Sequence, residues 1–343
     1  MPGKVFATHH ADDLLFNQYT TELLNKLADQ QLDNRRILVL HLNLVDKLTY
    51  HKIATEVARY KPDHIICFTG PEPNWAFDSQ LLLAALGSTP YSFLGYVKHP
   101  AATFLDFWAL CTDKFFPAYT DQQLAPVESN QFYLCHNRQP YAHRKLLVDA
   151  LDHSAGFISF GSRSEADRTI DKTLEFYQQE AFHPWHKKLD GTLIEIPYDT
   201  YTLGDLTVWQ QTVLNIVSDS FWINKPSKFG NLFISEKYYK PILGLRPFLT
   251  YGNPETYYAF KDLGFKTFEE DLGLFPADLT TSMEGAIVAI SSAVNYLNGI
   301  GPSARLAWYN KLMPKLLYNR DRFKQHVKEQ QAVLDNYRVW HAS

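Results

Sequence analysis

Residues 231–254, NLFISEKYYKPILGLRPFLTYGNP, carry the signals that decide the fold of this chain. An apolar run ends in an adjacent acid and base, Glu236 and Lys237, and a segment with helical character follows. Pro247 ends that segment, and a second apolar run leads into a Gly-Asn-Pro turn at Gly252. A short helix between two apolar strands is typical of α/β folds with parallel sheets. Taken alone, the Glu-Lys pair fits either a solvated helix end or a ligand site.

The first third of the chain shows the same alternation of strand-like and helix-like segments. The apolar, β-branched runs are residues 4–8, 36–44, 64–70 and 91–97, and the segments with helical spacing are 14–27, 48–60 and 78–86. This rhythm predicts a parallel, doubly wound sheet. Ligands of such sheets bind at the carboxyl ends of the strands, where the chain crosses to the other side.

A second α/β unit is predicted from about residue 130. Its strands are residues 131–138, 156–163 and 213–218, and its helices are 141–151, 205–208, 255–263, 283–297 and 304–339, the last interrupted at Pro314. The segment between residues 164 and 202 has no regular pattern. We therefore predict two Rossmann-like lobes, residues 1–126 and 127–300, with a cleft between them. A helical tail, residues 301–343, can pack back on the first lobe.

Composition indicates a folded protein of about two domains, because 343 residues are too many for one core. A net charge of −4 gives no global attraction for nucleic acid. Three cysteines far apart, Cys67, Cys111 and Cys135, fit buried thiols in a reducing compartment. Without an apolar run of about 18 residues we expect no membrane span. The expected location is the cytoplasm, that of the host if the chain is viral.

The HHADD loop at residues 9–13 offers an alternative metal chemistry. It resembles the strand-end His-x-Asp-Asp-Glu of zinc-dependent N-deacetylases, in which metal ligands and a base lie together. That interpretation uses His9, Asp12 and Asp13, and the HPWH segment at residues 183–186 would complete the ligand set. Leu14 stands where the deacetylases have Glu, which weakens the match. We therefore expect no metal site, and keep zinc-dependent deacetylation as the alternative.

Three nucleotide-binding signatures are missing or out of context. GIGPSA at residues 299–304 matches G-x-G-x-x-A, but a helix-like segment precedes it where a dinucleotide fold needs a strand. We interpret it as a helix end and a turn. No P-loop motif and no Asp-x-Asp occur, so neither a P-loop NTPase nor a metal-dependent GT-A glycosyltransferase is expected.

Basic residues gather where the strand at residues 131–138 runs into the next helix. They are Arg138, His143, Arg144 and Lys145. Basic side chains at a helix N-terminus oppose the helix dipole. A bound anion would remove that conflict and gain the free N–H groups of the helix. A solvated basic helix start is the other interpretation.

Carboxylates follow two further strands of the second lobe. Asp219 comes at the end of the strand at residues 213–218. Glu236 and Lys237 follow the apolar run at residues 231–235. A carboxylate can accept two hydrogen bonds from a ribose diol, and a lysine suits a diphosphate. Neighbouring strands ending in this order would line up base, ribose and diphosphate along one edge.

These pieces together resemble the donor-binding part of GT-B glycosyltransferases of the fucosyltransferase and exostosin kind. The family has a Glu-Asn-Ser-like strand end, a loop, Tyr-Ile/Val-Thr-Glu-Lys opening a helix, and a strand ending in a small-residue turn. Here VSDSFW and LFISEKYYKPILGLRPFLTYGNP match in that order, and FYLCHNR, HRKLLVDAL and FISFG match upstream. The similarity covers residues 131–268, with a poorly matched middle. GFKTF at residues 264–268 also resembles phage-type proteins.

The resemblance implies roles for the matched residues in binding the nucleotide-sugar donor. Arg144 would hold the donor phosphate, Glu236 the ribose and Lys237 the diphosphate, with Arg138 and Lys240 as further donor-binding residues. Two departures bear on the donor's identity. Ser218-Asp219-Ser220 replaces Glu-Asn-Ser, and Phe233 replaces a tyrosine, so the base and the sugar stay open.

The resemblance implies metal-independent transfer of a sugar from a UDP- or GDP-sugar to an acceptor hydroxyl, without another cofactor. The acceptor is a glycan or, in a phage-type enzyme, a hydroxymethylated DNA base. The predicted base that deprotonates the acceptor is Glu72, with Asp78 and His10 as further catalytic candidates. Trp75 would supply a stacking surface. A Pro-rich connecting loop is the other interpretation of residues 70–78, and a GT-B-shaped binding protein without catalysis is another alternative.

The helical tail is strongly basic over residues 305–328. Seven basic residues occur there with one opposing carboxylate, that of Asp321. A solvated helix face is one interpretation. The other is contact with an anionic acceptor such as modified DNA, which would make acceptor binding depend steeply on salt.

Overall fold

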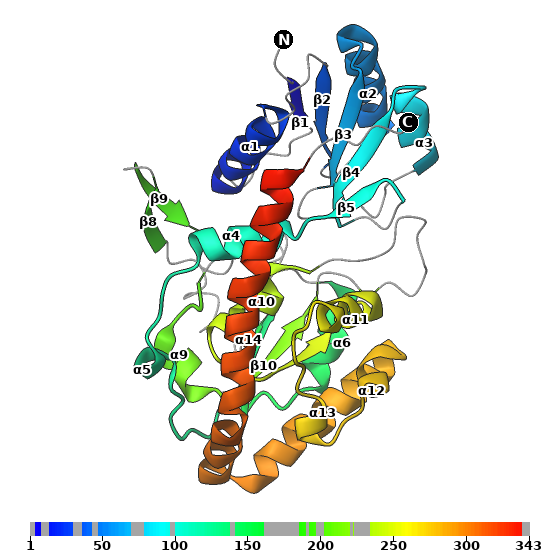
Figure 1. The fold of residues 1–343 in the computed structure, drawn as a ribbon. Coiled ribbons are helices and arrows are strands. Elements are labelled where there is room, and N and C mark those ends of the chain that lie inside the picture. Colours follow the sequence, from blue (N-terminus) through cyan, green and yellow to red (C-terminus); the bar gives the residue numbers. More distant parts are fainter. Residues whose placement is uncertain are drawn as a thin grey trace, which may run out of the picture. The chain divides into compact units, whose positions relative to one another are not determined.

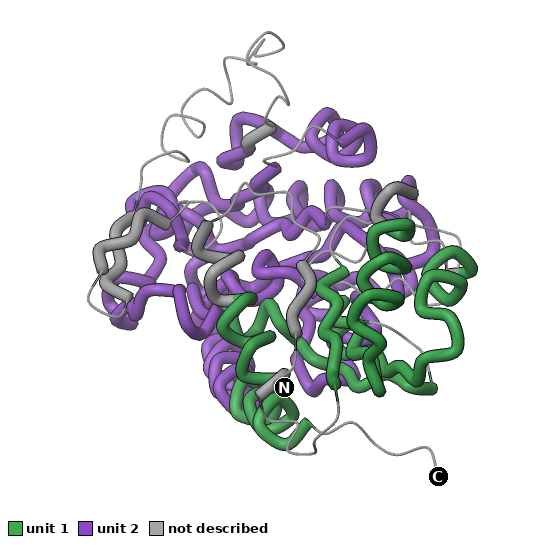
Figure 2. The backbone as a smooth tube through the Cα atoms, turned by 90° about the horizontal axis from the view of Figure 1, so that it is seen from above, with its two compact units in different colours: residues 1–111, 225–233, 327–343 green, residues 112–224, 234–326 purple. Residues whose placement is uncertain are grey.

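The computed structural model describes residues 4–7, 14–29, 36–42, 47–69, 79–96, 100–137, 141–160, 185–189, 192–196, 202–219, 222 and 234–337. The chain forms two compact units (Figure 2). Unit 1 contains residues 1–111, 225–233 and 327–343, and unit 2 contains residues 112–224 and 234–326. Both units are of the α/β class with parallel sheets, as the alternating pattern predicts.

Unit 1 is built on a five-stranded sheet in which every pair of neighbours is parallel. The strands are β1 (Lys4–Ala7), β2 (Ile37–His41), β3 (His64–Thr69), β4 (Tyr91–Gly95) and β5 (Ala102–Phe104) (Figure 1). They lie in sequence order, so this sheet lacks the reversal that a doubly wound sheet requires. The prediction of a doubly wound first sheet is therefore wrong for these strands, because periodicity reports strands but not their order.

The core of unit 1 lies between this sheet and its helices. These are α1 (Leu14–Asp29), α2 (Lys47–Tyr60), α3 (Ser79–Leu86) and α4 (Phe107–Phe115). Alternate strand residues such as Leu40 and Cys67 face α2 and α3, where Ile53 and Leu86 join one buried cluster. Phe68 points the other way and contacts the rings of His41 and Phe107. Both faces of the sheet are thus covered.

The end of the last helix, α14 (Pro302–Asn336), belongs to unit 1. The side chain of Gln330 accepts a hydrogen bond from the backbone N–H of Asp106 at 2.7 Å. The Tyr337 hydroxyl is 2.8 Å from the Ser92 hydroxyl, which also contacts the His64 ring. These buried polar contacts tie residues 330–337 to strands β3 and β4 and to the start of α4.

Unit 2 contains a four-stranded parallel sheet in the order β11-β10-β6-β7. Its strands are β6 (Tyr133–Asn137), β7 (Gly156–Phe160), β10 (Leu214–Ser218) and β11 (Phe248–Tyr251). The chain passes from β6 to β7 on one side and later places β10 on the other side of β6. The direction of winding therefore reverses between β6 and β10, the position at which open parallel sheets bind ligands.

Three helices follow strands of this sheet and begin at its carboxyl edge. They are α6 (Ala142–Ala150), α10 (Glu236–Leu243) and α11 (Pro254–Asp262). Ser235 caps α10 by accepting a hydrogen bond from the Lys237 N–H, and Asn253 caps α11 in the same way. The second half of the opening stretch thus forms helix and strand as predicted, while residues 231–233 lie outside the described residues.

The remaining elements of unit 2 include two that differ from prediction. They are α5 (Asp121–Leu124), α9 (Leu206–Gln211), the 3-10 turn η2 (Glu270–Leu272), α12 (Pro276–Thr280), α13 (Met283–Ile300), most of α14, and the hairpin β8 (Trp185–Leu189) with β9 (Thr192–Ile196). The hairpin lies in the segment for which no pattern was recognised. The predicted interruption at Pro314 is wrong: α14 continues through it, held by buried neighbours such as Leu312 and Leu316.

The GIGPSA segment forms a helix end and a turn, as predicted. Helix α13 ends at Ile300, and Gly301 follows with a φ of 76°, a conformation that glycine adopts without strain. Pro302 then opens α14. Among the described residues, no helix has the length and apolar character needed to cross a bilayer.

Candidate functional site

The candidate site is the carboxyl edge of the unit 2 sheet on both sides of the winding reversal. Helix α6 begins shortly after β6 ends, and Asp219 directly follows β10. Strand β11 pairs with β10 and ends at Tyr251 and Gly252. Of the residues predicted for the donor site, the structure brings Arg144 and Asp219 into contact.

Arg144 crosses from the first turn of α6 to the end of β10. Its side chain is buried, with the residue only 1% exposed. Nε donates a hydrogen bond to the backbone oxygen of Asp219 at 3.0 Å, and one terminal nitrogen donates to the backbone oxygen of Ser218 at 3.3 Å. Burial lowers the pKa of Arg144, while the negative charges of Asp219 and Glu236 oppose that shift. In this arrangement the guanidinium fixes the end of a strand.

The side chain of Asp219 is also buried and is held from several directions. Its backbone N–H donates to the Tyr251 oxygen at 2.8 Å. Its Oδ2 accepts a hydrogen bond from the Tyr238 hydroxyl at 3.3 Å, and burial raises the pKa of that tyrosine well above its usual range. Gly252 lies against it: a Cβ atom at Gly252 would stand 2.3 Å from the Asp219 Cβ. The close approach of strand ends β10 and β11 therefore requires a glycine.

Glu236 and Lys237 lie at the start of α10. Glu236 is buried and occupies the first helical position, where a carboxylate suits the positive end of the helix dipole. Lys237 is more accessible, with its side chain 27% exposed, and its Nζ is 3.2 Å from Glu236 Oε1. The two side chains thus pair with each other in this structure. Lysine is the member of the pair that can reach solvent.

Aromatic side chains line the same edge. The His143 ring stacks on Tyr141 with centroids 5.8 Å apart and contacts Tyr251 on another side at 6.0 Å. Tyr251 in turn contacts Trp222, a residue of the loop after β10, at 5.2 Å. His143 Nε2 lies 3.1 Å from the backbone oxygen of Asp219, so this nitrogen must carry the proton. Burial lowers the pKa of His143, which favours the neutral ring.

Lys240 lies one turn further along α10 than Glu236. Its positive charge acts on His136, a residue of β6, whose pKa burial lowers well below the usual range. Lys240 therefore contributes positive charge near β6, the strand that precedes α6.

The other predicted site residues lie outside the described residues. They are Arg138 of the donor set, the catalytic candidates Glu72, Asp78 and His10, the stacking candidate Trp75, and Phe233. The zinc alternative rests on His9, Asp12 and Asp13, which are not described either. Within the described part of the chain, no group of three His, Cys, Asp or Glu side chains is arranged to hold a metal ion.

Sequence reasoning missed Tyr238, Tyr251 and Gly252 as parts of the site. Tyr238 stands two residues after Glu236, and only its burial against Asp219 distinguishes it from other helical tyrosines. Gly252 carried a usable signal, because a glycine directly after an apolar strand often marks the close approach of another backbone. Tyr251 had no such signal in the sequence.

The basic tail is largely engaged within unit 2. Lys315 pairs with Asp271 at 2.5 Å, and Arg320 pairs with Asp121 at 2.6 Å. Arg305 and Arg322 donate to backbone oxygens, among them those of Leu297 and Leu263. Four of the seven basic residues in this run therefore have intramolecular acceptors. Fewer positive charges are left for an anionic partner than the sequence indicates.

Comparisons with family models, with curated proteins and with solved structures found no match to this chain.

Proposed function

We propose that this chain is a glycosyltransferase that uses a nucleotide-diphosphate sugar and binds its nucleotide at the carboxyl edge of the unit 2 sheet. One observation carries the proposal. The buried carboxylates of Asp219 and Glu236 lie within electrostatic reach of Arg144 at the winding reversal, next to the accessible amine of Lys237. Buried charges are costly unless they are paired or serve a ligand. This combination suits a ligand with a diol at one end and a diphosphate at the other.

Glu236 and Lys237 divide the recognition of such a ligand. The Glu236 carboxylate accepts hydrogen bonds from the ribose hydroxyls, as the resemblance to fucosyltransferase-like enzymes implies. Lys237 now pairs with Glu236 at 3.2 Å and would exchange that partner for the diphosphate. The amine of Lys237 is partly exposed, so an anion from solvent can reach it.

The same positive charge serves the chemical step. The bond between the sugar and the diphosphate breaks with negative charge building on the bridging oxygen. Lys237 and the positive end of helix α10 stabilise that charge, which is the kind of electrostatic assistance that lowers barriers most. The acceptor hydroxyl loses its proton to a base, for which Glu72, Asp78 and His10 remain the predicted candidates.

A glycan is favoured as the acceptor over modified DNA. The DNA interpretation rests on the basic tail, and Lys315 and Arg320 there pair with carboxylates of the same unit. A protein that binds DNA through phosphate contacts needs its cations free for them. A neutral hydroxylated acceptor has no such requirement.

Calorimetry with UDP and GDP tests the donor site. We expect the unaltered protein to bind at least one of them, and Lys237→Ala to weaken that binding by more than tenfold. Lys145→Ala is the matched control, because Lys145 is an exposed lysine of α6 that pairs with Asp149. Its affinity should equal that of the unaltered protein. The absence of UDP and GDP binding, or an equal effect of both variants, would refute the proposed donor site.

A further inference from the structure

We infer that Arg144 is a positioning residue that sets the carboxyl end of β10, and that it is not a ligand of the donor phosphate. This inference rests on the proposed function and changes one assignment within it. The resemblance to fucosyltransferase-like enzymes places a phosphate on this arginine, whereas the contacts in this chain engage it inside the protein.

The burial of Arg144 is the first argument. An arginine that binds a phosphate must present its N–H groups to the space where the anion lies. Arg144 is only 1% exposed. Its Nε and one terminal nitrogen donate to two consecutive backbone oxygens, those of Ser218 and Asp219. The ring of Tyr141 lies against the guanidinium, 5.1 Å from ring centroid to Cζ. Turning to a phosphate would break the hydrogen bonds from Arg144 to the Ser218 and Asp219 oxygens, and losing buried hydrogen bonds from a charged donor is costly.

The place that Arg144 holds is the second argument. Asp219 is the first residue after β10, at the winding reversal of the sheet. Four other groups converge on it: the Tyr238 hydroxyl at Oδ2, the Tyr251 carbonyl at its N–H, the His143 ring at its backbone oxygen, and Gly252 against its Cβ. A carboxylate held this firmly is pre-organised, so less freedom is lost when a ligand binds.

The charge balance is the third argument. Asp219 and Glu236 are buried anions that would repel each other, and the positive charge of Arg144 acts on both. Arg144 thereby offsets the repulsion between the two carboxylates, whose oxygens can accept hydrogen bonds from hydroxyl groups. Removal of Arg144 should weaken recognition of the hydroxyl groups of the nucleoside. Lys237 would still contact the phosphates.

The test compares a nucleoside with its diphosphate in the full chain. We expect Arg144→Lys to weaken the binding of the nucleoside and of its diphosphate by the same factor, which exceeds tenfold. The two pairs of ligands are guanosine with GDP and uridine with UDP. Lys237→Ala should instead weaken binding of the diphosphate, while the affinity for the nucleoside changes by no more than about twofold. Displacement calorimetry measures the weak nucleoside affinities. If Arg144→Lys lowers only the affinity for the diphosphate, Arg144 is a phosphate ligand and the inference fails.

Hydrogen exchange provides a readout that needs no ligand. In the unliganded protein, Arg144→Lys should speed amide exchange several-fold at residues 214–219, and Lys145→Ala should not. If Arg144→Lys folds poorly, Tyr238→Phe is the second variant. It keeps the shape of the side chain and removes only the hydroxyl that donates to Asp219. Unchanged exchange in both Arg144→Lys and Tyr238→Phe overturns the positioning role. If exchange becomes faster and the unaltered protein binds no nucleotide, the positioning role of Arg144 is supported and the proposed function is refuted.

Discussion

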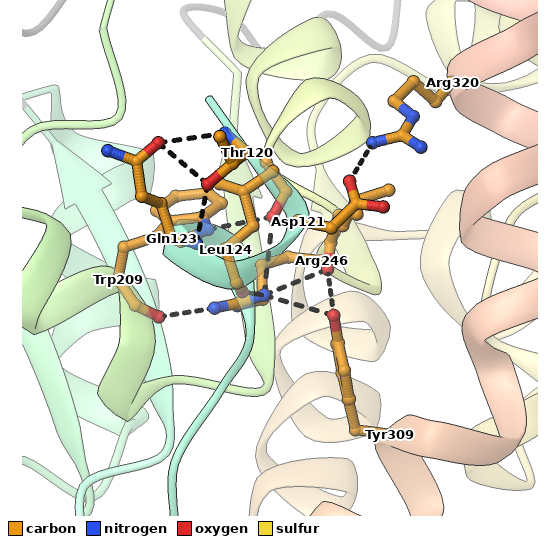
Figure 3. A network of polar contacts seen from close by, with 10 residues as sticks. Thr120, Asp121, Gln123, Leu124, Trp209, Arg246, Tyr309 and Arg320 are labelled. Carbon is orange, nitrogen blue, oxygen red and sulfur yellow. Dashed lines mark hydrogen bonds and ion pairs between the residues drawn. The ribbon is translucent and has the colours of Figure 1, made fainter. Parts of the chain in front are cut away.

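At the scale of single residues, Arg144 and Arg246, two of the buried arginines of unit 2, have different surroundings. Arg144 has the carboxylates of Asp219 and Glu236 within electrostatic reach. Arg246 is fully buried, and its hydrogen bonds go to neutral oxygens, those of Leu124 and Trp209 at 2.7 and 2.8 Å and the Tyr309 hydroxyl at 3.3 Å (Figure 3). Burial lowers the pKa of Arg246 to about 10, so it keeps its charge at neutral pH.

Replacing Arg246 should therefore cost more stability than replacing an arginine at the surface. Arg246→Met removes the charged donor to the backbone oxygens of Leu124 and Trp209 and to the Tyr309 hydroxyl, and a hydrogen bond to a charged group contributes about 1.5–3 kcal/mol. We expect the free energy of unfolding to fall by about 3 kcal/mol or more, measured by denaturant titration.

Arg320 supplies the matched control for that prediction. It stands near Arg246 in Figure 3 and pairs with Asp121, whose side chain is 71% exposed. Exposed pairs contribute about 1 kcal/mol or less, so Arg320→Met should change stability by no more than that. Equal losses in the two variants would contradict the role of Arg246 in joining α5, α9 and α14.

The sequence predicts residues of this kind only when their chemistry is local. Arg144, Glu236 and Lys237 stand at helix starts, where a basic or acidic side chain already suggests an anion or a diol. Arg246 stands in an ordinary turn, GLRP, and nothing in the sequence shows that three distant segments supply its acceptors. Hydrogen-bond acceptors that come from distant segments can be identified only from the three-dimensional structure.

At the scale of elements, the ends of strands β10 and β11 approach each other at a glycine. Gly252→Ala would place a Cβ 2.3 Å from the Asp219 Cβ, a separation that real atoms do not adopt. The strand ends must then separate, and overpacking of this kind costs about 1–3 kcal/mol. We expect lower stability in denaturant titration and, because Asp219 moves, nucleotide binding weakened by more than tenfold.

A second glycine gives a control with the opposite sign. Gly299 lies within α13, and a Cβ there would meet no atom within 4 Å. Gly299→Ala should stabilise the protein by about 0.5–1 kcal/mol through the helix preference of alanine, with binding unchanged. If both substitutions behave alike, the contact of Gly252 with Asp219 has no energetic importance.

Elements were predictable where a local pattern determines them and not where pairing does. Periodicity identified α6, α10, α11, α13 and the strands of both sheets except β5, which has only three residues. The order of the unit 1 strands was not predictable, because a strand carries no mark of its neighbour. The hairpin β8–β9 was missed because its first strand, WHKKL, mixes Trp, His and Lys without the expected alternation.

At the scale of the whole molecule, the chain returns to its first unit at the end. Residues 327–343 belong to unit 1, together with residues 1–111. Leu334 and Tyr337 are buried there, and Gln330 satisfies the N–H of Asp106. The first 111 residues therefore form an incomplete unit, so the sheet of unit 1 requires the end of α14.

Deleting residues 327–343 should consequently weaken one unit and spare the other. Loss of Leu334 and Tyr337 exposes apolar surface in unit 1, at about 25 cal/mol for each Å². Hydrogen exchange should become faster at residues 37–41 and 64–69 and stay unchanged at residues 133–137 and 214–218. A chain that ends at Tyr337 is the control, and its exchange should match that of the full chain. Faster exchange in both sheets would instead show that the two units unfold as one cooperative body.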